Sequence, residues 1–323
     1  MLECGTARRM SLQSFPDNPV PTGAAEQTVM TADGVRLRAA VWRPEGRLKG
    51  TVCIVHGRAE AIEKYYEVVG ELLERGFAVA SFDWRGQGAS ERRLQNPRKG
   101  HIDDFVEYER DLEAFIETVM LPDCPPPYFV LAHSTGGLVC LRLARRRPQA
   151  FSRMVLVSPL LDFGGFAPSR GFINFAAGAF SLLGLGDALP PGARIAEVDE
   201  RGFKGNPLTS DPRRFDRTIA IAKARPELTV GAPTIAWLHA ACRAMNEASN
   251  PAFAAEIRIP TLMIAAGEDK VVSPLAIERF AREMRIGSQI VIPGARHEIL
   301  MERDPMRGLF WAAFDAFVPG SDS

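Results

Sequence analysis

The stretch Y-F-V-L-A-H-S-T-G-G at residues 128–137 decides the fold, because an apolar, β-rich run leads straight into a predicted helix. A serine on such a sharp strand-to-helix turn is pushed outward, with its hydroxyl at the carboxyl edge of the sheet. Gly136 fits the G-x-S-x-G pattern of this turn, and Ala132 departs from it by one methyl group. We therefore predict that Ser134 is a nucleophile. The alternative is a serine that only caps the helix with its hydroxyl.

A nucleophilic serine needs a base and a carboxylate, which this kind of sheet supplies on loops after later strands, in the order Ser, acid, His. His297 in G-A-R-H-E follows the predicted strand Gln289–Ile292 and is the candidate base. Asp269 in A-A-G-E-D-K follows the predicted strand Thr261–Ala266 and is the candidate acid. Its neighbour Glu268 is the alternative, but it should point to the opposite side of the turn and has a longer, less rigid side chain.

The other four of the five histidines suit other roles. We expect His56 to form a turn at the end of a central strand, and His133 to direct its ring away from the serine. His101 should open a helix together with acidic residues. His239, which lies close to Trp237 in the middle of the chain, is expected in the core or in the lining of a pocket.

An oxyanion that forms during attack on a carbonyl group needs main-chain donors. We predict that these donors are the N–H groups of Thr135, directly after the nucleophile, and of Arg58, which follows His56-Gly57 at the end of an earlier strand. The side chain of Arg58 could face the cleft or pair with Glu60, and the sequence leaves both open.

The alternation of β-rich runs and helical patterns predicts a mostly parallel sheet that is covered by helices on both faces. The first two runs are joined by Ala32-Asp33-Gly34, which predicts an antiparallel pair. The run Thr51–Gly57 is continuously apolar, so we expect it in the centre of the sheet. The predicted strands cover residues 26–31, 35–42, 51–57, 77–83, 128–132, 153–158, 261–266 and 289–292.

The middle of the chain breaks this alternation. Between residues 160 and 256, glycine and proline are frequent, no β-rich run occurs and the helices look short. We interpret residues 160–256 as an insertion into a core that residues 25–159 and 257–323 form. Residues 1–24 are predicted to be a mobile N-terminal arm, and Met10 is an alternative start of the chain.

The composition excludes several classes of protein. Of the 323 residues, 46% are hydrophobic and 24% are charged, which suffices for a sizeable core and argues against disorder. Basic and acidic side chains number 39 each, so no net charge attracts nucleic acid. We interpret the run Arg145–Arg147 as cations at the negative end of a helix dipole.

Cysteines and apolar runs indicate the compartment. The five cysteines are odd in number and lack C-x-x-C spacing, which favours buried thiols in a reduced compartment. Neither a secretory signal nor a run of about 20 apolar residues occurs, so we expect a cytoplasmic protein. Without a cluster of metal ligands or a phosphate-cradling loop, we expect no metal and no cofactor. The R-G-Q-G at residues 85–88 is predicted to be a structural turn.

Six motifs resemble the α/β-hydrolase superfamily, and more narrowly its monoacylglycerol lipase and bacterial lysophospholipase branch among the serine aminopeptidase-like hydrolases. They are H-G-R-A-E at 56–60, F-D-W-R-G-Q-G-A-S at 82–90, G-H-I-D-D-F-V-E-Y at 100–108, L-A-H-S-T-G-G at 131–137, N-P-L-T-S-D-P at 206–212 and G-A-R-H-E at 294–298. The resemblance implies an α/β-hydrolase fold, with a mostly parallel eight-stranded sheet, helices on both faces and residues 160–256 as a helical cap, or lid.

The resemblance also implies a function. It makes Ser134, Asp269 and His297 a catalytic triad, and it favours a serine carboxylester hydrolase that acts on a single-chain lipid, either a lysophospholipid or a monoacylglycerol. Ala59 and Thr135 differ from residues that are common in that branch, which bears on the shape of the pocket.

The cap is where we expect the lipid to bind. Four apolar residues are predicted to line the pocket: Phe172, Phe175, Trp237 and Leu238. The cap is also expected to contact a membrane peripherally, at its inner face. Two alternatives stay open. One is a small-molecule esterase or a serine aminopeptidase-like hydrolase that binds an amino group through the carboxylates of Glu197, Asp199 or Glu200, and the other is a catalytically idle fold that only binds ligands.

Overall fold

An eight-stranded sheet organises the chain, and the computed structural model describes residues 11–46, 48–165, 168–193, 195 and 202–320. The strand order is β1-β2-β4-β3-β5-β6-β7-β8. The strands are β1 (Ala24–Met30), β2 (Arg36–Trp42), β3 (Thr51–Val55), β4 (Ala78–Phe82), β5 (Tyr128–His133), β6 (Arg153–Val157), β7 (Thr261–Ala266) and β8 (Gly287–Ile292). The eight predicted strands are thereby confirmed to within two residues at each end.

The pairing of the strands brings several loops to one edge of the sheet. β2 pairs antiparallel with β1 and with β4, and all other neighbours pair parallel. β3 lies between β4 and β5 and is buried throughout, which confirms the expected central position of this apolar run. Because the carboxyl ends of parallel strands share one edge, the loops after β3, β5, β7 and β8 meet there.

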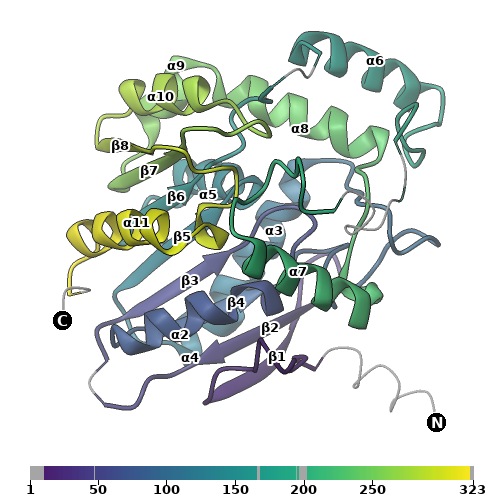
Figure 1. Cartoon of the computed structure of the whole chain (residues 1–323). Helices are drawn as coiled ribbons and strands as arrows, with labels where there is room; N and C mark the ends of the chain where they lie inside the picture. Colours follow the sequence, from purple (N-terminus) through teal and green to yellow (C-terminus); the bar gives the residue numbers. More distant parts are fainter. Residues whose placement is uncertain (1–10, 47, 166–167, 194, 196–201, 321–323) are drawn as a thin grey trace.

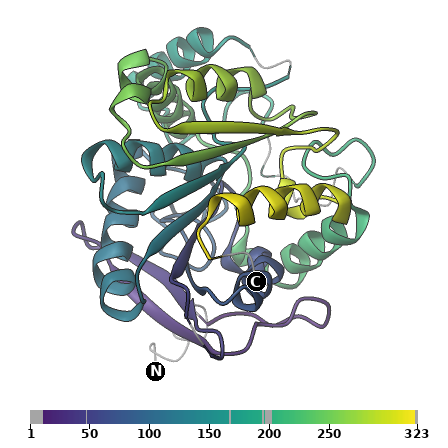
Figure 2. The same cartoon turned by 90° about the vertical axis from the view of Figure 1, so that its left-hand side faces the viewer.

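Helices cover both faces of the sheet, as expected (Figures 1 and 2). On one face lie α2 (Tyr66–Glu74) and α11 (Asp304–Phe317), and on the other lie α3 (Phe105–Phe115), α5 (Thr135–Arg146) and α10 (Pro274–Glu283). Shorter elements are η1 (Ile62–Tyr65), η2 (Ile116–Met120), α4 (Leu121–Asp123), η4 (Pro226–Leu228) and η5 (Ile299–Met301). Each layer buries its own apolar core against the sheet.

The segment between β6 and β7 is helical. It contains α6 (Arg170–Leu182), α7 (Pro212–Ala224), α8 (Ile235–Ala248) and α9 (Pro251–Glu256). The expectation of short helices is wrong, because α6, α7 and α8 have 13, 13 and 14 residues. Glycine serves packing in one of them: a Cβ on Gly178 of α6 would lie 3.0 Å from the ring of His239 on α8, so its absence lets the two helices approach closely.

Within this segment, α8 and α6 differ sharply in burial. α8 buries Trp237, Ala241 and Met245 in the core. α6 lies on α8 at the outer margin of the molecule, and Ala177 is its one buried residue (Figures 1 and 2). By burial, α8 is therefore part of the core, whereas α6 forms an outer layer.

The described part of the predicted N-terminal arm packs on the core. Residues 1–10, with the alternative start Met10, lie outside the described residues. From residue 11 onward the chain follows η1 and α2: the side chain of Asn18 is buried and donates to the main-chain oxygen of Glu63 at 2.7 Å. Leu12 and Val20 pack against the apolar core there.

The described cysteines are thiols inside the core. Cys53, Cys124, Cys140 and Cys242 are buried and free, as expected, while Cys4 lies outside the described residues. Burial raises the pKa of each of these four thiols, which keeps them protonated and unreactive. Among the helices of the described ranges, we find none that combines the length and the apolar character needed to cross a membrane.

Candidate active site

Ser134 occupies the turn between β5 and α5 in a strained conformation, with φ of 51° and ψ of −116°. Strain of this kind is typically kept at functional sites. Two glycines let the turn close. A Cβ on Gly136 would lie 2.4 Å from the main-chain oxygen of Val55, and one on Gly137 would lie 2.8 Å from the Cβ of Pro159. The hydroxyl of Ser134 makes no hydrogen bond that caps α5, so the alternative of a helix cap does not describe it.

The side chains of Ser134, His297 and Asp269 form one chain of hydrogen bonds. The Nε2 of His297 lies 3.1 Å from the Oγ of Ser134, and its Nδ1 lies 2.8 Å from the Oδ2 of Asp269. The other carboxylate oxygen of Asp269 accepts from the N–H groups of Val271 and Val272, at 2.8 Å and 3.0 Å. All three side chains are more than nine-tenths buried, so water competes little for these bonds.

The surroundings of Asp269 keep its carboxylate charged. Burial by itself would raise the pKa of Asp269, but the hydrogen bonds from His297, Val271 and Val272 outweigh burial and lower the pKa. A charged carboxylate at the Nδ1 of His297 holds the proton on that nitrogen. The Nε2 is thereby left as the acceptor that faces the serine hydroxyl.

The other sequence candidates lie elsewhere. Glu268 is exposed, and its N–H donates to the main-chain oxygen of Ala295 at 2.8 Å, so the structure brings Asp269 and not Glu268 to His297. Three histidines hydrogen-bond to other groups: His56 to the oxygen of Gly57, His101 to the hydroxyl of Thr234 and His239 to the oxygen of Asn174.

Main-chain N–H groups lie next to the serine. A Cβ on Gly57, just after β3, would lie 3.2 Å from the Cβ of Ser134, so the end of β3 touches the turn that carries Ser134. Thr135 is the first residue of α5, where a helix leaves its N–H groups without partners inside the helix. The two segments that carry the predicted oxyanion donors are therefore side by side.

The N–H of Arg58, in the loop after β3, has no partner among the described residues. The N–H of Gly57 donates to Glu60 at 2.5 Å, and the N–H of Ala59 donates to Gln87 at 2.6 Å. Between them, the N–H of Arg58 has no acceptor anywhere in the part of the chain that the structure describes. This main-chain group is therefore available to a ligand, and Gln87 is a supporting residue that the sequence did not identify.

Glu60, Lys64, His133 and Glu298 form a buried charged cluster next to the main chain of His297. The Nζ of Lys64 is 2.7 Å from Glu60 and 2.6 Å from Glu298. The Nδ1 of His133 is 3.3 Å from Glu60, and its Nε2 is 3.3 Å from the main-chain oxygen of His297. The sequence predicts only that the ring of His133 turns away from Ser134. It carries no signal that Glu60, Lys64, His133 and Glu298 meet, because they come from three separate parts of the chain: the region of η1, the end of β5 and the loop after β8.

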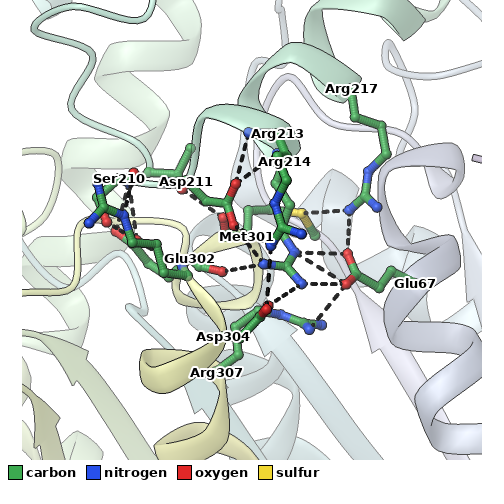
Figure 3. A network of polar contacts seen from close by, with 12 residues as sticks. Glu67, Ser210, Asp211, Arg213, Arg214, Arg217, Met301, Glu302, Asp304 and Arg307 are labelled. Carbon is green, nitrogen blue, oxygen red and sulfur yellow. Dashed lines mark hydrogen bonds and ion pairs between the residues drawn. The ribbon is translucent and has the colours of Figure 1, made fainter. Parts of the chain in front are cut away.

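The segment 206–211 is bound to the loop that carries His297. The N–H of Glu298 donates to the oxygen of Leu208 at 2.8 Å, and the hydroxyl of Thr209 donates to the oxygen of Met301 at 2.6 Å. The fully buried carboxylate of Glu302 accepts from the N–H and the hydroxyl of Ser210, at 3.0 Å and 2.5 Å (Figure 3). The N–H of residue 296, next to the histidine, also donates to Glu302 at 2.8 Å. This part of the inserted segment therefore supports the candidate base.

Ion pairs extend this connection to α7. The carboxylate of Glu67 on α2 lies within 2.5 Å of Arg214 and of Arg217 on α7, and 3.2 Å from Arg307 on α11 (Figure 3). Burial would raise the pKa of Glu67, but the three guanidinium groups lower it to about 2. Helix α7 is thus tied to two core helices.

The predicted pocket residues divide into two groups. Phe172 and Phe175 lie on α6 with 63% and 76% of their surface exposed. Trp237 is buried on α8 and donates through Nε1 to the hydroxyl of Tyr108 at 3.1 Å. Leu238, its neighbour, packs partly buried against the core. A pocket role for these residues stays a prediction. The carboxylates considered for an amino group, Glu197, Asp199 and Glu200, lie outside the described residues.

The R-G-Q-G segment has structural contacts. Arg85 pairs with Asp111 at 2.7 Å and with Asp33 at 2.8 Å. A Cβ on Gly88 would lie 2.1 Å from the carboxylate of Asp83, so the turn wraps around that side chain. Among the described residues, no three His, Cys, Asp or Glu side chains are grouped so that they could hold a metal ion.

Comparisons with known proteins agree with this architecture. The sequence profile of the family described as serine aminopeptidase, S33 matches residues 46–304. Lysophospholipase L2 of Escherichia coli strain K12 is 33% identical over 269 residues, which cover 80% of this chain and 77% of that protein. Monoacylglycerol lipase of Mycolicibacterium smegmatis is 26% identical over 287 residues, which cover 88% and 93%. A soluble variant of monoglyceride lipase from Saccharomyces cerevisiae has the same fold, with a TM-score of 0.75 at 17% identity over 97% of this chain and all of that one. The chain therefore belongs to the serine aminopeptidase S33 family of α/β-hydrolases.

Proposed function

We propose that this protein is a serine carboxylester hydrolase that works through an acyl-enzyme. Ser134 is the nucleophile, His297 the general base and Asp269 the acid that orients it. The observation that carries this proposal is the continuous chain of hydrogen bonds from the Oγ of Ser134 through His297 to Asp269, at 3.1 Å and 2.8 Å. Such a constellation is recognised by geometry and by the role of each group.

The reaction proceeds in two steps. The Oγ of Ser134 attacks the ester carbonyl carbon while the Nε2 of His297 takes the hydroxyl proton, and the N–H groups of Arg58 and Thr135 bind the resulting oxyanion. His297 then gives the proton to the oxygen of the departing alcohol, which leaves an acyl-enzyme. In the second step, His297 takes a proton from water, the hydroxide attacks the acyl carbon, and the proton returns to Ser134 as the fatty acid leaves.

Single-chain lipid esters are the proposed substrates. The relatives are named lysophospholipase L2 and monoacylglycerol lipase, and such substrates carry one acyl chain. In this proposal, residues 160–256 form a cap over the active site, with Trp237 and Leu238 of α8 next to the acyl chain. The exposure of Phe172 and Phe175 suits contact with a lipid surface better than the lining of a pocket.

The outer helix α6 is the proposed contact with a membrane. Between Gly171 and Gly186 the chain has no charged residue, and its exposed apolar side chains include Phe175 at 76%, Leu182 at 91% and Leu183 at 74%. A contiguous apolar surface of this kind typically marks an interaction site. Since the chain has no net charge, we expect this local apolar surface, and not long-range electrostatic attraction, to bring the protein to a membrane.

Labelling with a fluorophosphonate tests the catalytic assignment. The wild type should be labelled and Ser134→Ala should not, because the reagent bonds to an activated serine hydroxyl. Equal labelling of both proteins, or of neither, would contradict the proposal. Initial rates on a lysophospholipid, a monoacylglycerol, short esters and aminoacyl amides then test the substrate. A preference for short esters or for amides would overturn the lipid assignment in favour of the small-molecule esterase or the aminopeptidase-like hydrolase.

Cosedimentation with phosphatidylethanolamine and phosphatidylglycerol vesicles tests the membrane contact. The double variant Phe175→Ser with Leu182→Ser should bind vesicles more weakly than the wild type, because it removes the two most exposed large apolar side chains of α6. Leu309→Ser is the matched control, since Leu309 is 52% exposed on α11, away from α6. Equal binding by all three proteins would argue against α6 as the contact.

A further inference from the structure

Arg58 carries a charge directly beside the nucleophile. It follows Gly57, where a Cβ would lie 3.2 Å from the Cβ of Ser134. Because consecutive Cα atoms are about 3.8 Å apart, the main chain of Arg58 is also close to Ser134. The proposed role of the main-chain N–H of Arg58 is to donate a hydrogen bond to the oxyanion. Its side chain is a separate feature, and the sequence leaves open whether this side chain pairs with Glu60 or faces the cleft.

The guanidinium of Arg58 does not pair with Glu60. The carboxylate of Glu60 is already held by Lys64 at 2.7 Å and by the hydroxyl of Tyr65 at 2.8 Å. Arg58 forms no ion pair with any residue in the described ranges, and its one hydrogen bond runs from Nη1 to the main-chain oxygen of Gly231 at 2.8 Å. A guanidinium has five N–H donors, so most of the donors of Arg58 have no acceptor among the described residues.

These free donors reach solvent. Arg58 is only partly buried, and neither its Nε nor its Nη2 is both unpaired and fully buried. The guanidinium lies over the ring of Trp237, 5.6 Å from its centroid, at the boundary between the core and α8. Burial lowers the pKa of Arg58 more strongly than Tyr108 and Glu60 raise it, so the described residues compensate its charge poorly.

A partly buried cation without an anion is unfavourable unless a ligand supplies the missing charge. Arginine suits phosphate in particular, because its planar fork donates two parallel hydrogen bonds to two phosphate oxygens. In a lysophospholipid, the glycerol carbons and one oxygen separate the scissile ester from the phosphorus. The side chain of Arg58, which starts beside Ser134, spans a comparable length.

We propose that Arg58 binds the phosphate of a lysophospholipid head group while Ser134 attacks the ester, and that it thereby sets a preference for lysophospholipids over monoacylglycerols. This inference rests on the proposed function and narrows its substrate class. The main-chain N–H of Arg58 stabilises the oxyanion of either substrate, whereas the guanidinium distinguishes them, because a monoacylglycerol presents only an uncharged hydroxyl at that position.

Another arginine provides the matched control. Arg92 also lacks a carboxylate partner in the described residues, but its guanidinium donates to the main-chain oxygens of Gly86, Gly88 and Glu227, the last two at 2.6 Å and 2.8 Å. Its donors are used by the protein, so Arg92 is a structural residue. Comparing alanine variants at the two positions distinguishes the loss of a partly buried arginine from the loss of a group that binds phosphate.

The experiment measures kcat/KM on a lysophosphatidylethanolamine and on a monoacylglycerol with the same acyl chain, both below their critical micelle concentrations. We expect Arg58→Ala to lower the ratio of kcat/KM for the lysophospholipid to kcat/KM for the monoacylglycerol by about 10- to 100-fold. This is the usual effect of one hydrogen bond to a charged group. The loss should appear mainly as a higher KM for the phospholipid, because the phosphate is bound equally before and during the reaction. Arg58→Lys should restore part of the ratio, and Arg92→Ala should leave it at the wild-type value.

The outcomes separate this inference from the proposed function. Fluorophosphonate labelling at Ser134 verifies that each variant is folded and active. An equal loss on both lipids in Arg58→Ala, or a wild type that cleaves only the monoacylglycerol, would overturn the role of Arg58 and leave the hydrolase intact. A wild type that cleaves neither lipid, or activity that survives in Ser134→Ala, would overturn both.

Discussion

The rings of His133 and His297 lie 4.8 Å apart, and the Nε2 of His133 is 3.3 Å from the main-chain oxygen of His297. His133 directly precedes Ser134, so the end of β5 carries both the proposed nucleophile and a group that supports the proposed base. The Nδ1 of His133 faces the carboxylate of Glu60 at 3.3 Å. Since both nitrogens face acceptors, the doubly protonated ring suits this position.

Replacement of His133 should change stability in a pH-dependent way. Burial lowers the pKa of His133, but the nearby carboxylate of Glu60 raises it further, and the net result is a pKa above the ordinary 6.5. The stabilisation that follows is complete below the ordinary pKa and is lost as the pH rises through the pKa of the folded state. Relative to the wild type, His133→Gln should therefore be less stable by a larger margin at about pH 6 than at about pH 9.

Urea unfolding at both pH values measures this difference. A margin that stays constant with pH would show that the ring contributes only by packing. The same variant should also have a lower kcat, because the main chain of His297 loses a donor that holds it in place.

Asp269→Asn should reduce kcat by about 10⁴-fold, because the amide no longer favours the tautomer of His297 that accepts the serine proton. Glu268→Gln is the control, since Glu268 is exposed and adjacent in sequence. Steady-state rates on one ester substrate suffice for the comparison. If Glu268→Gln lost as much activity as Asp269→Asn, the assignment of the acid would be wrong.

Gly136→Ala should destabilise the fold by at least about 2 kcal/mol, because its Cβ would press on main-chain oxygens of Val55 and His56 that cannot move aside. Gly171→Ala on α6 has no atom within 4 Å of the new Cβ. This control should stabilise the protein by about 0.5–1 kcal/mol, since alanine favours a helix more than glycine does. Thermal unfolding of both variants checks the expected opposite signs.

Glu302→Ala should lower both stability and kcat. The variant leaves the partly buried N–H and hydroxyl of Ser210 and the N–H of Arg296 without their acceptor, and we expect a total cost of about 1–3 kcal/mol, because solvent can satisfy part of these groups. It also loosens the loop that carries His297. Glu283→Ala, at the exposed end of α10, is the control. Wild-type stability and kcat in Glu302→Ala would show that segment 206–211 is not needed to hold the base.

Much of the fold could be predicted because its signals are local. The apolar run Thr51–Gly57 indicates a central strand, and the proline after Ser273 indicates a helix start that the structure confirms. The prediction of short helices between residues 160 and 256 failed for the opposite reason. That expectation came with the frequent glycine and proline of the segment, but Gly178 lies inside α6 and allows a close approach to His239, 61 positions away in the chain.

The sequence alone predicted the eight strands to within two residues at each end, and it pointed to Ser134, Asp269 and His297, because hydrophobic period, turn residues and chain order are encoded locally. Only the tertiary structure decided which groups surround them. It paired Glu60 with Lys64, turned His133 toward the main chain of His297 and placed no anion of the described residues at the guanidinium of Arg58. The physical reason is that pairing of buried charges depends on which loops the strand order brings together, and that order is a property of the whole sheet.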